Sequence, residues 1–145
     1  MELFPKIGID NIRFGLTQTE VLSLLGHPDK TFADPDEENE IFCQYNQYKL
    51  TLTFYLSENN RLGYIRCANP EITFNGNKIL NLLVKKIQRE VFPKLSQTWE
   101  IEYYDFFDTY FTEDYWLTLN VEYGEITDLE IGVPINSDDM YDWPS

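Results

Sequence analysis

The clearest pattern along the chain is a strict alternation of apolar and polar residues in LTLTFYL, residues 50–56, where every second residue is Leu or Phe. A period of two predicts a half-buried antiparallel strand. Residues 115–122 alternate in the same way and predict a second strand of this kind. Shorter apolar runs between turn residues predict further strands at 41–47, 62–67, 72–74, 99–104, 106–111 and 126–133, with a short strand or extended segment in 1–11.

Two segments have helical spacing instead. Thr17 and Glu20 form a capping box, in which each side chain satisfies a free backbone N–H of the first turn. Gly26 suits the C-cap and Pro28 prevents continuation, so we expect the first helix at 17–25. The second helix is expected at 78–92, ending at Pro93, because apolar residues recur there at helical intervals: Ile79, Leu80, Leu83, Ile87 and Val91.

These elements predict an α+β protein in which two helices pack on an antiparallel sheet of six to eight strands. At 145 residues, we expect a single domain over 1–145. The sequence also contains an internal repeat, since VLSLL at 21–25 resembles ILNLL at 79–83, and LTLTFYL at 50–56 resembles LTLNVEY at 117–123. This predicts two halves, 1–69 and 70–135, each made of a strand, a helix and three strands, followed by an acidic tail at 136–145.

Charge divides the chain unevenly. The net charge is −14, and residues 95–145 hold 13 of the 25 carboxylates and none of the 11 basic residues. We therefore expect no nucleic-acid partner and no anionic membrane surface, both of which require Lys and Arg. The acidity either serves solubility alone or forms a surface for a cationic partner. The predicted second helix holds one cluster of basic residues, Lys78, Lys85, Lys86 and Arg89. This cluster is a solvated face, a site for an anion, or a surface that pairs with the acidic third of the chain.

Catalytic and metal-binding patterns are missing from the sequence. The single histidine, His27, follows the first helix, where its cation would favour the helix C-terminus. No metal-ligand spacing and no phosphate-binding glycine loop occurs, so we expect no metal, no cofactor and no enzymatic activity. A carboxylate enzyme acting on a sugar stays an alternative, since carboxylates are abundant. Without a signal sequence, Cys43 and Cys67 are expected to be reduced, buried thiols of a cytoplasmic protein.

The segment 99–116 combines nine aromatic residues with six carboxylates. On alternating strands about half of these rings must face the core, and the others are of types favoured as interface anchors. The carboxylates beside them can pair with Lys and Arg of a partner. The predicted partner-binding residues are Tyr103, Tyr104, Asp105, Asp108, Tyr110, Glu113, Asp114 and Tyr115, with Asp138, Asp139, Tyr141, Asp142 and Trp143 of the tail as a second contact. The alternative is that they serve only packing and solubility.

Two resemblances follow from these segments. FGLTQTEVLSLLGHPD, residues 14–29, resembles the helix and turn of the BamE/SmpA-like lipoproteins of outer-membrane assembly. The chain differs from that group in having no signal and no lipid-bearing cysteine, so the membrane role does not carry over.

The whole chain resembles the immunity proteins of bacterial polymorphic-toxin and contact-dependent growth inhibition systems. In these, an opening such as GIDNIRFGLTQTEVLSLLGHPDK precedes strands, a segment like NPEITFNGNKILNLL and then acidic strands. The resemblance implies a cytoplasmic antitoxin-type protein that binds and occludes a cognate basic toxin domain, a nuclease. The alternative is a non-enzymatic adaptor module for protein–protein interaction.

Overall fold

The computed structural model describes residues 1–95 and 98–145. Its helices are α1 (Gln18–Leu25) and α2 (Val84–Glu90), with short 3-10 turns at Leu56–Glu58 and Pro93–Leu95. The main strands are β4 (Lys30–Phe32), β5 (Glu40–Tyr45), β6 (Leu50–Tyr55), β7 (Arg61–Cys67), β10 (Trp99–Tyr103), β11 (Asp108–Thr112), β12 (Leu117–Glu122) and β13 (Glu125–Gly132). They form one antiparallel sheet of eight strands in the order β10-β11-β12-β13-β7-β6-β5-β4. The α+β prediction is therefore confirmed.

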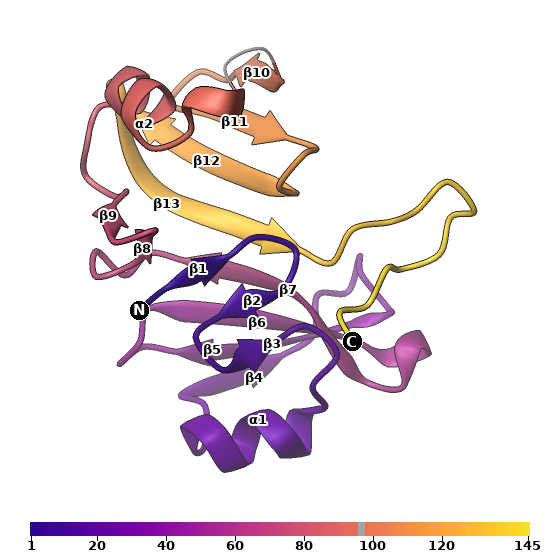
Figure 1. Cartoon of the computed structure of the whole chain (residues 1–145). Coiled ribbons are helices and arrows are strands. Elements are labelled where there is room, and N and C mark those ends of the chain that lie inside the picture. The colour runs from indigo at the N-terminus through magenta and orange to yellow at the C-terminus, as the bar shows by residue number, and fades with distance from the viewer. Residues whose placement is uncertain (96–97) are drawn as a thin grey trace.

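The remaining strands are short. β1 (Leu3–Phe4), β2 (Gly8–Ile9) and β3 (Ile12–Arg13) form a three-stranded sheet, and β8 (Thr73–Phe74) pairs with β9 (Asn77–Lys78). The chain thus runs twice through a small hairpin, a helix and a four-stranded meander. Figure 1 shows the two units in contact through β7 and β13, with α1 and α2 far apart on opposite sides of the molecule. Each predicted half contains one such unit, with four strands after the helix where three were expected.

The internal correspondence is visible in the backbone hydrogen bonds. Gly15 N–H donates to Leu62 O and Leu62 N–H donates to Leu16 O, at 2.9 and 2.7 Å. The second unit repeats this with Asn81, Ile126 and Leu82, at 2.7 and 2.9 Å. Thr17 then forms an isolated antiparallel β-bridge with Arg61, and Leu83 forms the equivalent β-bridge with Glu125. The first helix therefore corresponds to the second at an offset of 66 residues. The predicted match of 21–25 with 79–83 is wrong, because it pairs a helical segment with the turn that precedes the second helix.

The match between residues 50–56 and 117–123 does lie at equivalent places, in β6 and β12. In both strands the register shifts at the fourth residue of the motif, after Thr53 in β6 and after Asn120 in β12. The extra residue of each bulge lies in the following strand, Gly63 in β7 and Thr127 in β13. A bulge bends the strand and raises its twist, so both meanders curve at the same point.

The first helix forms as predicted. Thr17 is the N-cap, its side chain accepts from Glu20 N–H, and the Glu20 carboxylate accepts from Thr17 N–H. Gly26 caps the other end with a φ of 80°, which favours glycine.

The second helix is much shorter than the predicted 78–92. Residues 79–83 form a turn that leads into the helix, with Asn81 at a φ of 65°. The turn is held because Asn81 N–H donates to Ile126 O of β13 and Leu82 O accepts from Ile126 N–H. The apolar spacing in this segment arises instead because Ile79 and Leu80 are buried in the core. Neither helix in the described residues has the length and apolarity of a membrane span.

One core joins the small sheets, both helices and one face of the large sheet. The core includes Ile9 of β2, Val21 of α1 and Ile87 of α2, each at most 1% exposed. Cys43 and Cys67 are free thiols buried in it, as predicted. Because side chains alternate across a strand, residues between the core positions of β7, β12 and β13 point to the opposite face, which we call the polar face.

Candidate functional site

The most exposed aromatic segment is residues 102–107, which we call the aromatic hairpin. It joins the end of β10 to the start of β11, and all six of its residues are exposed. Tyr103 is 74% and Phe106 84% exposed. Tyr104 N–H donates to Phe107 O at 2.9 Å and closes the turn. Four rings and two carboxylates are therefore presented together on a tight turn, without a basic residue among them.

Local contacts hold part of the aromatic hairpin in place. The rings of Tyr104 and Phe107 stack with centroids 4.8 Å apart. The Tyr104 hydroxyl donates to Glu102 Oε2 at 2.6 Å, and this hydrogen bond raises the pKa of Tyr104. Two rings are thereby fixed, while Tyr103 and Phe106 project beside them. Exposed apolar groups of this density on a well-formed turn are typical of interaction surfaces.

The other predicted residues of 103–115 do not all join this surface. Asp108 begins β11 and is half-buried. Tyr110 is only 5% exposed and belongs to the core, so its expected outward position is wrong. It lies opposite Leu119 of β12, on the face that α2 covers, with Lys85 Nζ 5.4 Å from its ring centroid.

Glu113, Asp114 and Tyr115 lie at the far end of β11, in the turn to β12. The five residues of β11 separate them from the aromatic hairpin by about 17 Å. Glu113 and Asp114 are exposed. Tyr115 packs instead against Phe92 and Phe74, with ring centroids 6.0 and 5.7 Å away. The predicted continuous surface is therefore divided.

The acidic tail lies at the same end of the sheet as Glu113, and in Figure 1 it loops out beyond β13 and returns toward the first unit. Tyr141 stacks on Tyr55 at 5.1 Å, and Arg61 lies 4.4 Å from the ring centroid of Trp143. These two rings, predicted as partner contacts, hold the tail against the protein. The other three predicted contact residues of the tail, Asp138, Asp139 and Asp142, are exposed.

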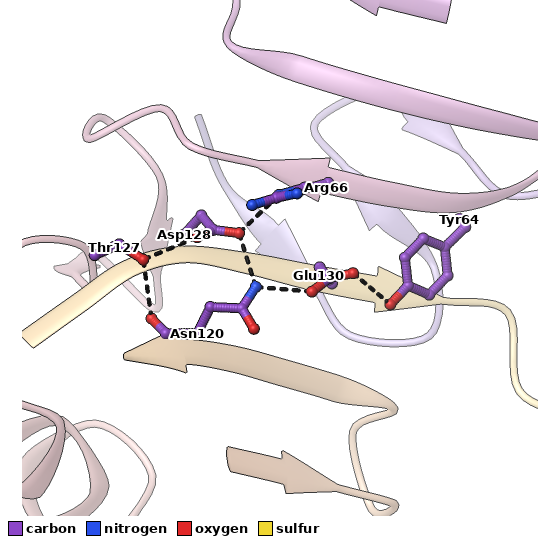
Figure 2. A network of polar contacts seen from close by, with 6 residues as sticks. All are labelled: Tyr64, Arg66, Asn120, Thr127, Asp128 and Glu130. Carbon is purple, nitrogen blue, oxygen red and sulfur yellow. Dashed lines mark hydrogen bonds and ion pairs between the residues drawn. The ribbon is translucent and has the colours of Figure 1, made fainter. Parts of the chain in front are cut away.

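A network of polar side chains lies beside the aromatic hairpin on the polar face (Figure 2). Asp128 Oδ2 accepts from Arg66 Nε at 2.9 Å and from Asn120 Nδ2 at 2.8 Å. Asn120 Nδ2 also donates to Glu130 Oε2 at 2.7 Å, and Glu130 Oε1 accepts from the Tyr64 hydroxyl at 2.9 Å. The network crosses the junction of the two units, since Tyr64 and Arg66 belong to β7 and the two carboxylates to β13.

The network residues other than Tyr64 line a depression of about 270 Å³, together with Phe107 of the aromatic hairpin and Glu122 at the end of β12. Burial, and then the charge of Glu130, raise the pKa of Tyr64, so its hydroxyl remains a donor at neutral pH. The oxygens of Asp128 and Glu130 that share Asn120 lie at most 5.5 Å apart, from their bonds of 2.8 and 2.7 Å. With Glu122, three carboxylates and one guanidinium line the depression, and this excess of negative charge favours a cationic group of a partner.

A catalytic use of this pair has less support. Retaining glycosidases hold two carboxyl groups about 5–5.5 Å apart. Here both carboxylates already accept hydrogen bonds from Arg66, Asn120 or Tyr64. Within residues 1–95 and 98–145 no three His, Cys, Asp or Glu side chains are grouped to hold a metal.

Sequence reasoning missed the network. Asp128 and Glu130 alternate with apolar residues on β13, which marks them as neighbours on one face, and Asn120 occupies the bulge position of the repeated motif. The pairing with Arg66, 62 residues away, depends on the contact between β13 and β7. No short-range pattern encodes that contact.

The fold is similar to the crystal structure of a DUF4309 family protein (YjgB) from Bacillus subtilis, with a TM-score of 0.53 and 12% identity over 86% of this chain and 83% of that one. An extracellular protein containing a SCP domain from Bacillus anthracis gives a TM-score of 0.48 and 11% identity, over 83% of this chain and 46% of that one. At such identities the similarity concerns the fold alone. No protein-family model and no curated protein matches the sequence.

Proposed function

We propose that this protein is a cytoplasmic, non-enzymatic immunity protein that binds and occludes a basic toxin domain, a nuclease. The observation that carries the proposal is the aromatic hairpin, in which six consecutive exposed residues supply four rings and two carboxylates. The resemblance of the whole chain to immunity proteins supplies the class of partner.

The aromatic hairpin supplies the kind of contact that anchors an interface. Tyr103 and Phe106 project into solvent and would be buried by a partner without disturbing the core. Tyr123, which is fully exposed in the β12–β13 turn, lies at the same end of the sheet. Turns at one sheet end, with the depression beside Phe107, provide the centre of an interface of standard size, about 1,600 Å² in total.

Charge provides the second contribution. The third of the chain that holds the aromatic hairpin carries 13 carboxylates and no base. A nuclease surface that holds nucleic acid is rich in Lys and Arg, and opposite charges of this kind accelerate association. In this scheme the acidic side chains attract the partner at long range and speed association, and the rings stabilise the complex once the two surfaces are in contact.

The functional test uses the toxin. The reading frame immediately upstream should encode a secreted protein that ends in a small basic domain, toxic when expressed alone. Co-expression of this chain should restore growth, and the purified pair should form a complex. Tyr103→Ala with Phe106→Ala should abolish protection, whereas Phe4→Ala, which removes a 43% exposed ring from β1, should protect normally. Protection by the double variant would contradict the assignment of the surface.

The steering charge has a matched control, because aspartates lie beyond both ends of β11. Asp105→Lys alters the aromatic hairpin, and Asp114→Lys makes the same charge change at the other end of the strand. Asp105→Lys should slow association several-fold at low ionic strength and reduce its salt dependence, with a smaller effect from Asp114→Lys. Equal effects of the two variants would show that only net charge matters.

The alternative is a non-enzymatic adaptor that binds another cellular protein, with acidity serving solubility. The exposed rings of the aromatic hairpin suit that function equally. Binding to a partner that carries no excess of basic residues, with an affinity unchanged between low and high salt, would favour the adaptor.

A further inference from the structure

A groove of about 400 Å³ lies between α2, the turn at Pro93–Leu95 and the edge strand β10. Val84 and Ile87 turn one face of α2 into the core, which leaves the neighbouring positions of the helix to line the groove. Trp99 and Ile101, two residues apart on β10, supply its apolar side. The lining residues are Lys85, Gln88, Arg89, Pro93, Trp99 and Ile101.

The charge of the groove opposes that of the whole protein. Lys85 and Arg89 form no ion pair within residues 1–95 and 98–145, and no carboxylate lines the groove. The adjacent Lys86 differs, since it pairs with Glu90 at 4.0 Å. Two positive charges without a carboxylate partner in the described residues thus lie beside an apolar wall, in a protein whose net charge is −14.

Trp99 adds an unsatisfied donor. Its indole N–H is buried and has no acceptor in the part of the chain that the structure describes. Buried donors are almost always bonded, and an unpaired one is unfavourable. Because the nitrogen is closed to solvent in the empty groove, an incoming acceptor reaches it only if the ring turns on binding.

We infer that this groove binds a small organic carboxylate with an apolar body. Arg89 and Lys85 would hold the carboxylate, Gln88 would donate an additional hydrogen bond, and the body would lie on Pro93, Trp99 and Ile101. A polyanion such as nucleic acid is disfavoured, since two bases cannot offset repulsion by the remaining carboxylates. A monoanion inside the groove meets mainly the local pair, because exposed charges beyond about 8 Å are screened at physiological salt. This site is independent of the proposed function.

The test is a titration with 4-phenylbutyrate, followed by the indole N–H resonances in a ¹H–¹⁵N spectrum. The chain has three Trp residues, and Trp99→Phe identifies the relevant signal. That resonance should shift with saturation on addition of phenylbutyrate. Lys85→Met with Arg89→Met should weaken binding by about tenfold or more. Lys86→Met, which removes a neighbouring charge outside the groove, should leave the affinity unchanged. Arg89→Gln alone provides a milder variant.

Two further measurements separate the possible failures. 4-Phenylbutylamine has the same apolar body and the opposite charge, and it should not shift the Trp99 resonance. The proposal is wrong if phenylbutyrate gives no saturable shift, if the amine binds as well as the acid, or if the Lys85/Arg89 variant binds with wild-type affinity. Saturable binding of inorganic phosphate in preference to phenylbutyrate would overturn the carboxylate assignment. Toxin binding plays no part in any of these results.

Discussion

Gly63 provides the sharpest test of the packing around the bulge in β7. It is the extra residue of the bulge in β7, and a Cβ at this position would lie 2.0 Å from Tyr55 Cε2 and 2.4 Å from Tyr55 Cδ2. Ordinary contact begins near 3.4 Å, so the Tyr55 ring would have to move by about 1.4 Å. That ring stacks on Tyr141, which fixes the tail.

The cost of Gly63→Ala can be worked from these contacts. Overpacking a filled site costs about 1–3 kcal/mol. Loss of the stack between Tyr55 and Tyr141 adds about 0.5–1.5 kcal/mol. We therefore expect the free energy of unfolding to fall by about 2–4 kcal/mol, and the melting temperature by about 6–12 °C for a chain of this size. Urea unfolding followed by tryptophan fluorescence measures the first quantity.

The second unit identifies the ring, rather than the backbone, as the reason for glycine. In the second unit, Thr127 of β13 occupies the position of Gly63, and the exposed Glu122 of β12 occupies the position of Tyr55. No ring at this position therefore lies over the bulge, and a residue with a Cβ is accommodated. Gly63→Ala should therefore cost less than about 0.5 kcal/mol when combined with Tyr55→Ala. The reasoning is refuted if Gly63→Ala costs as much in that background, or if the single variant is as stable as the wild type.

Three further changes test the network, the capping box and a buried thiol. Asn120→Leu removes the amide donor that Asp128 and Glu130 share, so the loss of two hydrogen bonds to charged carboxylates should cost about 3 kcal/mol in urea unfolding; a loss under 1 kcal/mol would contradict this. Thr17→Ala removes the N-cap of α1 and should cost about 1 kcal/mol, whereas Thr19→Ala on the same helix should cost little. Burial raises the pKa of Cys67 to about 11 from 9.0, so the folded state favours the neutral thiol. This contribution is present below pH 9 and is lost as pH rises, and the wild type should therefore lose about 1 kcal/mol more than Cys67→Ala between pH 8 and 10.

Several local features could be predicted because their signals lie within a few residues. Thr17, Glu20 and Gly26 define α1 through bonds that span a single turn. The alternation in 50–56 places Leu50 and Leu52 in the core, at 1% and 0% exposure. The exposed aromatic hairpin was also predicted in part, since it is a short turn whose composition is visible in the sequence.

Other features depend on contacts between distant parts of the chain. Residues 79–83 have the spacing of a helix, and they form a turn because β13 supplies hydrogen-bond partners to Asn81 and Leu82. Tyr110 has the composition of an interface residue, and its place on β11 beneath α2 buries it.

The sequence by itself therefore determined the helix caps, the alternation of the strands and the concentration of charge and rings in the last third. Only the tertiary structure decided which predicted contact residues share a surface. The strand length of β11 separates Glu113 from the aromatic hairpin, and the register of β7 against β13 brings Arg66 to Asp128. A register of this kind arises from the joint packing of both units, whereas a cap or an alternation arises from near neighbours in the chain.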